Sequence, residues 1–340
     1  MRKARTLALL LAFVFAALFP SPGFSQLVRV GRAGLISDAG IYIAFEKGYY
    51  KEQGIKIEMG PTIPAGEQMA MLGAGKLEVV AGGINPGLFN AIARGLPIVM
   101  VADKGSLPPG YGFMSLIVRK DLWDSGQVKR IKDLKGKVVA TNAPSSPNVY
   151  LWARTMEKEG LTLADVDMKS IPFPLMATAL GNKAIDAANP GEPHATKAVE
   201  MGVGVRMMTL DQVTPYMQIA AIFYNRDFST KSQELARRWM VGYLKGVRQY
   251  HDALREKGSK REEMIQVLMK HTGIKEQDVY DKMVWAGLNP DGLLNKESIL
   301  DQQKFFVEIG QVPKPAPLEK IVDDSFVNHA LQVLGRYGTR

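Results

Sequence analysis

The chain has 340 residues, of which 46% are hydrophobic; its formal net charge is +9 and it contains no cysteine. This length fits two domains of roughly 100–200 residues each, and the apolar content excludes an intrinsically disordered or collagen-like chain. The lack of cysteine excludes disulfides, zinc–thiolate sites, iron–sulfur clusters and thiol nucleophiles.

The first residues have the layout of a secretory signal peptide. Three basic residues at positions 2–5 precede an apolar run over 7–19. The small residues Gly23 and Ser25 then suit a cleavage site after Ser25. Because the run is too short to span a bilayer comfortably, we expect residues 1–25 to be a cleavable leader and the protein to be exported. Without the three leader cations the net charge falls from +9 to +6, and the remaining charges are interspersed. This pattern is not typical of a nucleic-acid-binding surface, so no nucleic-acid partner is expected.

Strand-like and helix-like segments alternate in the next part of the chain. We expect strands at 27–33, 55–59, 77–81 and 98–102, and helices at 41–48, 66–73 and 88–94. Glycines at positions 48 and 95 are typical of helix C-termini. Strands that alternate with short helices predict right-handed βαβ units and a mostly parallel sheet.

The same rhythm restarts at residue 113 and then gives way to helices. The expected strands are 113–118, 137–140, 184–188, 203–208 and 219–224, and the expected helices are 149–159, 175–180 and 194–201. From Ser232 onward we expect mainly helices, at 233–257, 261–272, 276–283, 297–309 and 323–334. Two α/β units followed by helices predict two lobes with a cleft between them, where ligands bind at the C-terminal ends of strands.

Four strand-end loops carry small and polar residues, and each precedes a helix. They lie at 34–40, 82–87, 141–148 and 189–194. The candidate ligand-binding residues in these loops are Ser37, Asp38, Gly83, Ile84, Asn85, Ser145, Ser146, Asn148, Asn189 and Glu192. Free N–H groups at helix N-termini favour carboxylate, sulfonate or phosphate groups, although the same residue types are also ordinary helix caps. Because two loops come from each lobe, at equivalent strand ends, we expect all four to face one cleft.

Two of these candidates are acidic and would repel a bound anion. Asp38 and Glu192 fit an anion site only if they cap backbone amides or pair with cations such as Arg32 or Arg119. The charge of the ligand therefore stays open. Tyr224, at the end of an expected strand, is a further candidate for the cleft.

The familiar motifs of enzymes and metal sites are absent from the sequence. The four histidines are scattered, and there is no G-x-S-x-G, no P-loop and no complete dinucleotide fingerprint. We therefore expect a protein that is not an enzyme and that uses neither a cofactor nor a metal. Trp239, Tyr243 and Tyr250 lie four and seven residues apart, on one face of an expected helix, and Trp152 lies in another expected helix. All four are expected in the core.

The segment from Tyr42 to Ile55 resembles a family signature, A-x-E-x-G-[YF]-[YF]-x-x-x-G-[IL]. The signature is that of solute-binding proteins of ABC importers, of the nitrate/sulfonate/taurine-binding type, a group that also includes binders of thiamine-pyrimidine precursors. Further matches at 72–79, 95–98, 133–137 and 184–188 follow in the family's order. The resemblance covers nearly all of the chain after the leader.

The resemblance implies a two-lobed, type II-like periplasmic-binding-protein fold of the α/β class. Each lobe would be a mostly parallel sheet flanked by helices, with two crossing strands and a helical C-terminal region. Residues 26–112 and 225–340 would form the first lobe, and residues 113–224 the second.

The function that the resemblance implies is transport. A periplasmic monomer would capture a small organic anion, such as a sulfonate, a nitrate-like ion or an aromatic carboxylate, and deliver it to an ABC permease and its ATPase at the inner membrane. The alternatives are a binder of a pyrimidine or another heterocycle, a ligand sensor for a membrane kinase, and an exported enzyme on the same scaffold.

Overall fold

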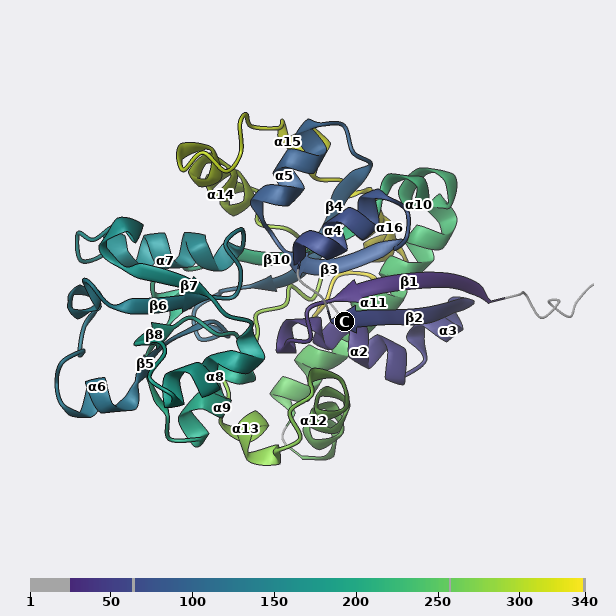
Figure 1. Ribbon diagram of the computed structural model, residues 1–340. Coiled ribbons are helices and arrows are strands. Elements are labelled where there is room, and N and C mark those ends of the chain that lie inside the picture. The colour runs from purple at the N-terminus through teal and green to yellow at the C-terminus, as the bar shows by residue number, and fades with distance from the viewer. Residues whose placement is uncertain (1–24, 63–64, 257, 339–340) are drawn as a thin grey trace, which may run out of the picture.

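The computed structural model describes residues 25–62, 65–256 and 258–338. The expected signal peptide lies outside these residues except for Ser25. Two lobes, each built around a five-stranded sheet, lie side by side in Figure 1. No helix in the described part of the chain is long and apolar enough to cross a membrane.

The sheet of the first lobe has four parallel strands and one antiparallel strand. Its order is β2 (Ile55–Thr62), β1 (Gln26–Arg32), β3 (Val79–Gly83), β10 (Gln218–Asn225) and β4 (Ile98–Ser106). β10 is the antiparallel strand, and it is hydrogen-bonded to β3 on one side and β4 on the other. The expected lobe boundary at residue 224 would assign this strand to the second lobe, whereas its pairing places it in the first sheet. The exact boundaries of the lobes otherwise stay a prediction.

The sheet of the second lobe has the same kind of arrangement. Its order is β7 (Asp167–Ser170), β6 (Val138–Thr141), β8 (Ala187–Ala188), β5 (Ser115–Arg119) and β9 (Gly204–Thr209). Here β5 is the antiparallel strand, paired with β8 and β9. The prediction of two mostly parallel sheets flanked by helices is thereby confirmed.

Helices flank both sheets, and a helical C-terminal region follows β10 (Figure 1). The helices before β10 are α2 (Ala39–Glu46), α3 (Tyr49–Glu52), α4 (Ala65–Gly73), α5 (Pro86–Ala93), α6 (Lys120–Asp124), α7 (Pro147–Glu157), α8 (Phe173–Gly181) and α9 (His194–Glu200). Those after it are α10 (Arg226–Lys231), α11 (Gln233–Arg255), α12 (Ser259–Thr272), α13 (Gln277–Lys282), α14 (Lys296–Glu308), α15 (Leu318–Ile321) and α16 (Ser325–Leu334). Neither β7 nor the short helices α3, α6, α10 and α15 are predicted from the sequence.

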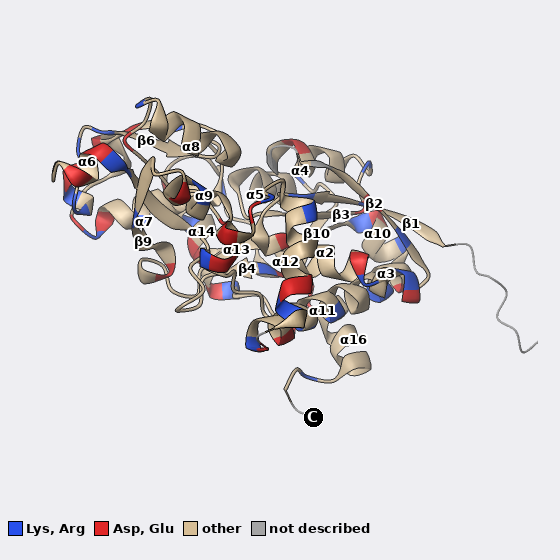
Figure 2. Ribbon diagram, turned by 90° about the horizontal axis from the view of Figure 1, so that it is seen from below, with Lys and Arg blue, Asp and Glu red and all other residues tan. Residues whose placement is uncertain are grey.

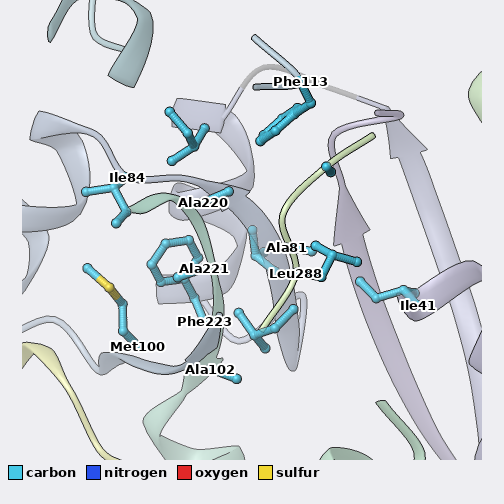
Figure 3. Close-up of a cluster of buried hydrophobic side chains, with 14 of the residues drawn as sticks. Ile41, Ala81, Ile84, Met100, Ala102, Phe113, Ala220, Ala221, Phe223 and Leu288 are labelled. Atoms are coloured by element: carbon cyan, nitrogen blue, oxygen red, sulfur yellow. The ribbon is translucent and has the colours of Figure 1, made fainter. Parts of the chain in front are cut away.

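The core of the first lobe surrounds the central strand β10. Figure 3 shows Ala221 and Phe223 of this strand among buried side chains of β3 and β4, including Ala81 and Met100. The long helix α11 adds an aromatic layer, in which the rings of Trp239 and neighbouring residues stack. The four aromatic residues expected in the core, Trp152, Trp239, Tyr243 and Tyr250, are all buried.

The C-terminal helices contact the second lobe from two sides. On one side, Lys197 of α9 forms an ion pair with Glu276, the residue before α13. On the other side, Asp301 of α14 accepts a hydrogen bond from the Tyr150 hydroxyl of α7 and pairs with Arg154 at 3.5 Å. Figure 1 shows α13 and α14 on opposite sides of β10. Acidic and basic residues are interspersed over the helices of both lobes in the view of Figure 2.

Two connecting segments, 107–114 and 210–217, run side by side between the lobes. The Leu107 N–H donates to the Met217 carbonyl at 3.0 Å, and the Tyr216 N–H donates back to the Leu107 carbonyl at 2.7 Å. A Cβ on Gly112 would lie 2.0 Å from Asp211 Oδ1, so only glycine fits at this position. These contacts bind the two connections into one joint between the lobes.

Candidate functional site

The four strand-end loops meet in two pairs across the junction of the lobes. The Ile36 N–H of the first loop donates to the Glu192 carbonyl of the fourth loop at 3.2 Å. Gly83 of the second loop lies against Pro147 of the third, because a Cβ on Gly83 would be 3.0 Å from Pro147 Cγ. The structure therefore brings together the four loops that the sequence analysis selects, with the lobes in contact.

The first loop holds a buried ion pair. The Asp38 carboxylate lies 2.8 Å from Lys104 Nζ of the crossing strand β4, and the two side chains are 0% and 1% exposed. Its second oxygen accepts N–H groups of Ala33 and Leu35 and the hydroxyl of Tyr42, at 3.1–3.2 Å. Asp38 thus meets both conditions set for it, since it bonds backbone amides and pairs with a cation. The cation, however, is Lys104.

Ser37 shares this cation, and Arg32 does not take part. Lys104 Nζ donates to Ser37 Oγ at 2.9 Å, and Ser37 is buried. The Arg32 guanidinium instead donates to the hydroxyl of Tyr42 and to the carbonyl of His271, both at 3.2 Å. Arg32, one of the two cations named as examples for the acidic candidates, therefore does not pair with Asp38, because Lys104 of β4 lies at that carboxylate.

The second loop is a helix cap held against a crossing strand. Asn85 is the N-cap of α5, and its side-chain oxygen accepts the Leu88 N–H at 3.1 Å while its amide donates to the Gly83 carbonyl. Ile84 is buried, and its N–H donates to the Ile219 carbonyl of β10 at 3.0 Å. Pro86 occupies the first turn of this helix.

The third loop leads into α7, with Ser146 as its N-cap residue and Pro147 as its first helical residue. The Ser146 hydroxyl donates to the Ala143 carbonyl at 3.0 Å, so it closes the loop on itself rather than capping the helix. Ser145 is exposed. Asn148 is buried and exchanges hydrogen bonds with Asn189 of the fourth loop, at 2.8 and 2.9 Å.

The fourth loop carries Glu192, whose carboxylate is saturated with donors. It accepts the Arg206 guanidinium at 2.6 Å, the hydroxyl and N–H of Thr196 at 2.9 Å each, and the Val284 N–H at 3.3 Å. Burial raises the pKa of Glu192, and Arg206 opposes this shift. Arg119, the other cation named as an example for the acidic candidates, pairs with Asp186 instead. With its carbonyl on Ile36 and its carboxylate on Val284, Glu192 links the second lobe to two other parts of the chain.

Tyr224 does not lie with the other candidates. It is fully buried at the far end of β10, where its hydroxyl donates to the Ala236 carbonyl of α11 at 3.0 Å. Its ring packs against Phe228, Trp239 and Phe326. The position is a correction to the sequence analysis: the C-terminal end of an antiparallel strand points away from the loops that follow its parallel neighbours.

Lys104 and Arg206 are the charged residues that the sequence analysis misses at this site. Lys104 lies on β4, far in sequence from Asp38. Arg206 lies on β9, whereas its partner Glu192 lies in the fourth loop. No local spacing signals such a pair. Within the described ranges, no group of three or more His, Asp or Glu side chains is placed to hold a metal ion.

Asp103, the neighbour of Lys104, is hydrogen-bonded to the second crossing strand and to a loop of the C-terminal region. Its carboxylate accepts the Asn289 N–H at 2.7 Å, the Gln218 amide at 2.5 Å and the Gly105 N–H at 3.2 Å. Burial raises the pKa of Asp103 to about 6, against the pull of these donors. The carboxylate joins both crossing strands to the loop that follows α13.

The Asp103 carboxyl is expected to titrate near pH 6 in the folded protein. Because this pKa lies above the ordinary 3.8, the group contributes stability that is complete below about pH 4 and is lost as the pH rises through 6, on the order of 3 kcal/mol in all. Carbon-13 NMR of the assigned carboxyl measures the midpoint directly. Asp133, whose pKa is lowered by N–H bonds from Lys129 and Arg130, is the internal reference. A midpoint for Asp103 at or below 4 would contradict the prediction.

Comparison with known proteins identifies relatives of this chain. The family model described as NMT1/THI5 like matches residues 36–253, which is more than half of the chain. No curated protein sequence matches the chain.

Solved structures share the fold along almost the whole chain. One is the periplasmic aliphatic sulphonate binding protein SsuA from Escherichia coli, at 21% identity and a TM-score of 0.68, covering 88% of this chain and 92% of that one. Another is the periplasmic nitrate-binding protein NrtA from Synechocystis PCC 6803, at 17% identity and a TM-score of 0.75, covering 91% and 89%. The desulfurization enzyme DszB also shares the fold, at 14% identity and a TM-score of 0.63, covering 90% and 99%. The two-lobed fold of periplasmic binding proteins is thereby shown.

Proposed function

The chain belongs to the NMT1/THI5-like family, and on this basis we propose that it is the periplasmic solute-binding subunit of an ABC importer. It captures a small organic anion between the lobes and delivers it to a membrane permease. The observation that carries the proposal is the meeting of four loops from two lobes, joined by Ile36 to Glu192 and by Gly83 to Pro147. The names of SsuA and NrtA, sulphonate-binding and nitrate-binding, support the class of ligand.

Closure of the lobes is the physical basis of this function. A ligand that touches both lobes binds the closed state better than the open state and shifts the population toward it. The buried side chains of these loops include hydroxyls and amides with fixed partners, such as those of Ser37, Asn85 and Asn148. Such groups orient a polar ligand by hydrogen bonds. The desulfurization enzyme DszB shares this fold, so binding without chemistry is part of the proposal.

A neutral heterocycle is the second candidate ligand, and the charges at the site favour it. Asp38 is neutralised by Lys104 and Glu192 by Arg206. A bound anion would therefore meet paired charges in these loops and depend on hydrogen bonds and helix N-termini, whereas an uncharged heterocycle needs no counterion.

The first experiment is a thermal-shift panel on protein that has been unfolded and refolded to remove carried-over ligand. The panel contains nitrate, alkyl sulfonates, taurine, benzoates and pyrimidines. A ligand at 1,000 times its dissociation constant adds about 4 kcal/mol and raises the melting temperature by several degrees. A shift confined to the anions or to the pyrimidines decides between the two candidates. A folded protein that responds to none of them contradicts both.

Ser37→Ala is expected to weaken binding of the ligand that the panel identifies by about tenfold, the effect of one lost hydrogen bond. Isothermal titration calorimetry measures the affinity. Ser229→Ala is the matched control, because Ser229 is also a buried serine but donates to the Arg226 carbonyl within α10. Equal affinities for both variants would remove Ser37 from the site.

Import and sensing differ in what the loaded protein activates. As an import subunit, it is expected to stimulate ATP hydrolysis by its permease complex in proteoliposomes only when ligand is present. Stimulation of a membrane kinase in place of the ATPase would assign the protein to sensing.

A further inference from the structure

A cavity of about 320 Å³ lies behind the joint between the lobes, apart from the four loops. Its walls come from four distant segments: the connecting segment with Pro108 and Tyr111, the end of α11, the turn at 287–290, and the C-terminal Tyr337. A volume of this size is at the lower end of the range for small-molecule sites, roughly 300–1,000 Å³.

The walls of this cavity are fixed by hydrogen bonds. The Ser106 N–H donates to the Gly287 carbonyl at 2.8 Å, and a Cβ on Gly287 would lie 2.3 Å from Pro108 Cδ. The ring of His251 is hydrogen-bonded to the Leu288 carbonyl. The Tyr337 hydroxyl donates to Asp252 at 2.6 Å. A ligand that enters therefore meets a preformed site and loses little free energy in ordering it.

The lining is mostly flat and apolar. Tyr111 is 37% exposed, a large solvent-facing area for a tyrosine ring. With Tyr337, Pro108, Pro290 and Leu254 it forms walls that suit a planar ring.

The cavity also holds a cation without an acidic partner. Among the described residues, no carboxylate lies within ion-pair distance of Arg255, whose guanidinium packs over the Tyr337 ring at 5.2 Å. The two acids closest in sequence are already bonded: Asp252 accepts the Tyr337 hydroxyl at the cavity wall, and Glu256 pairs with Lys260 at 2.7 Å. Arg255 is thus available to bind a carboxylate in a bidentate manner.

We propose that this cavity is a second ligand-binding site, which takes a small aromatic carboxylate. The ring lies among Tyr111, Tyr337 and the prolines, and the carboxylate binds Arg255. The occupant also touches the segment 107–114 that connects the lobes. This site does not depend on the ligand of the four loops, so the two assignments fail independently.

The test is calorimetric titration with benzoate as the probe. The full-length chain is expressed, and the protein is purified after its export. Benzoate is expected to bind, and acetate and benzamide at least fivefold more weakly, because the first lacks the ring and the second the charge. Arg255→Gln and Tyr111→Ala are each expected to weaken benzoate binding at least fivefold. Lys260→Gln, a nearby exposed cation outside the cavity, is the matched control and is expected to change nothing.

Three outcomes overturn the proposal. They are no benzoate binding by the native chain, binding that both cavity variants retain, and an equal loss in the Lys260→Gln control. Benzoate binding that falls in Ser37→Ala but not in Arg255→Gln assigns the probe to the four loops and also overturns it. The fold of each variant is checked by its melting temperature.

Discussion

Replacing Gly83 with methionine is expected to hold the two lobes apart and to lower ligand affinity at least 100-fold. A Cβ at this position would already lie 3.0–3.1 Å from Pro147 Cγ and Cδ in the opposite lobe, and the longer side chain extends beyond it. The closed state must open to make room, while the first sheet keeps its pairing. Small-angle X-ray scattering is expected to show a larger radius of gyration, and calorimetry the loss of affinity.

Gly66→Met is the matched control for this variant. Gly66 lies in α4, and a Cβ there meets no atom of the described residues within 4 Å. This change is expected to leave both the radius of gyration and the affinity as they are. If Gly83→Met binds ligand as tightly as the native protein, the pairing of the second and third loops has no part in closure.

Replacing Lys104 with methionine is expected to lower the free energy of unfolding by about 3–5 kcal/mol. The change removes the cation from Asp38, which is 0% exposed, and leaves an uncompensated charge in the interior. Urea denaturation monitored by circular dichroism measures the loss.

A second substitution separates the charge from the packing. In the Lys104→Met background, Asp38→Asn removes the buried charge while its oxygen can still accept the Leu35 N–H, so part of the stability is expected to return. Lys120→Met breaks an exposed pair with Asp124 and is expected to change stability little. If Lys104→Met behaves like Lys120→Met, the buried pair does not stabilise the fold.

Most of the fold follows from apolar periodicity, and the exceptions have identifiable causes. Strands such as β3 and β10 are continuous apolar runs because both of their faces are buried. β7 is an edge strand with the sequence Asp-Met-Lys-Ser, and three of its four residues are exposed, so no apolar pattern marks it. The missed helices α3, α6, α10 and α15 have four to six residues, too few for a helical period to be recognised.

The candidate site could be located from the sequence, but its internal contacts could not. Loop positions follow from strand order, since parallel strands end at the same edge of a sheet. The pairing of Asp38 with Lys104 depends on which face of β4 turns toward the first loop. The prediction that Tyr224 lies in the cleft is wrong for a related reason, because the direction of β10 in the sheet decides which of its ends faces the loops. The orientation of β4 and the direction of β10 are set by the assembly of the sheet, and no local stretch of residues encodes them.

The place of β10 between β3 and β4 has a consequence for the order of events during synthesis. The strands β1 to β4 leave the ribosome first, yet β4 has no partner in its sheet until residues 218–225 are made. The sheet of the first lobe therefore stays incomplete until the second lobe has been translated and β10 can pair with β3 and β4. Nascent chains of this topology cannot complete either a native first lobe or its hydrophobic core early.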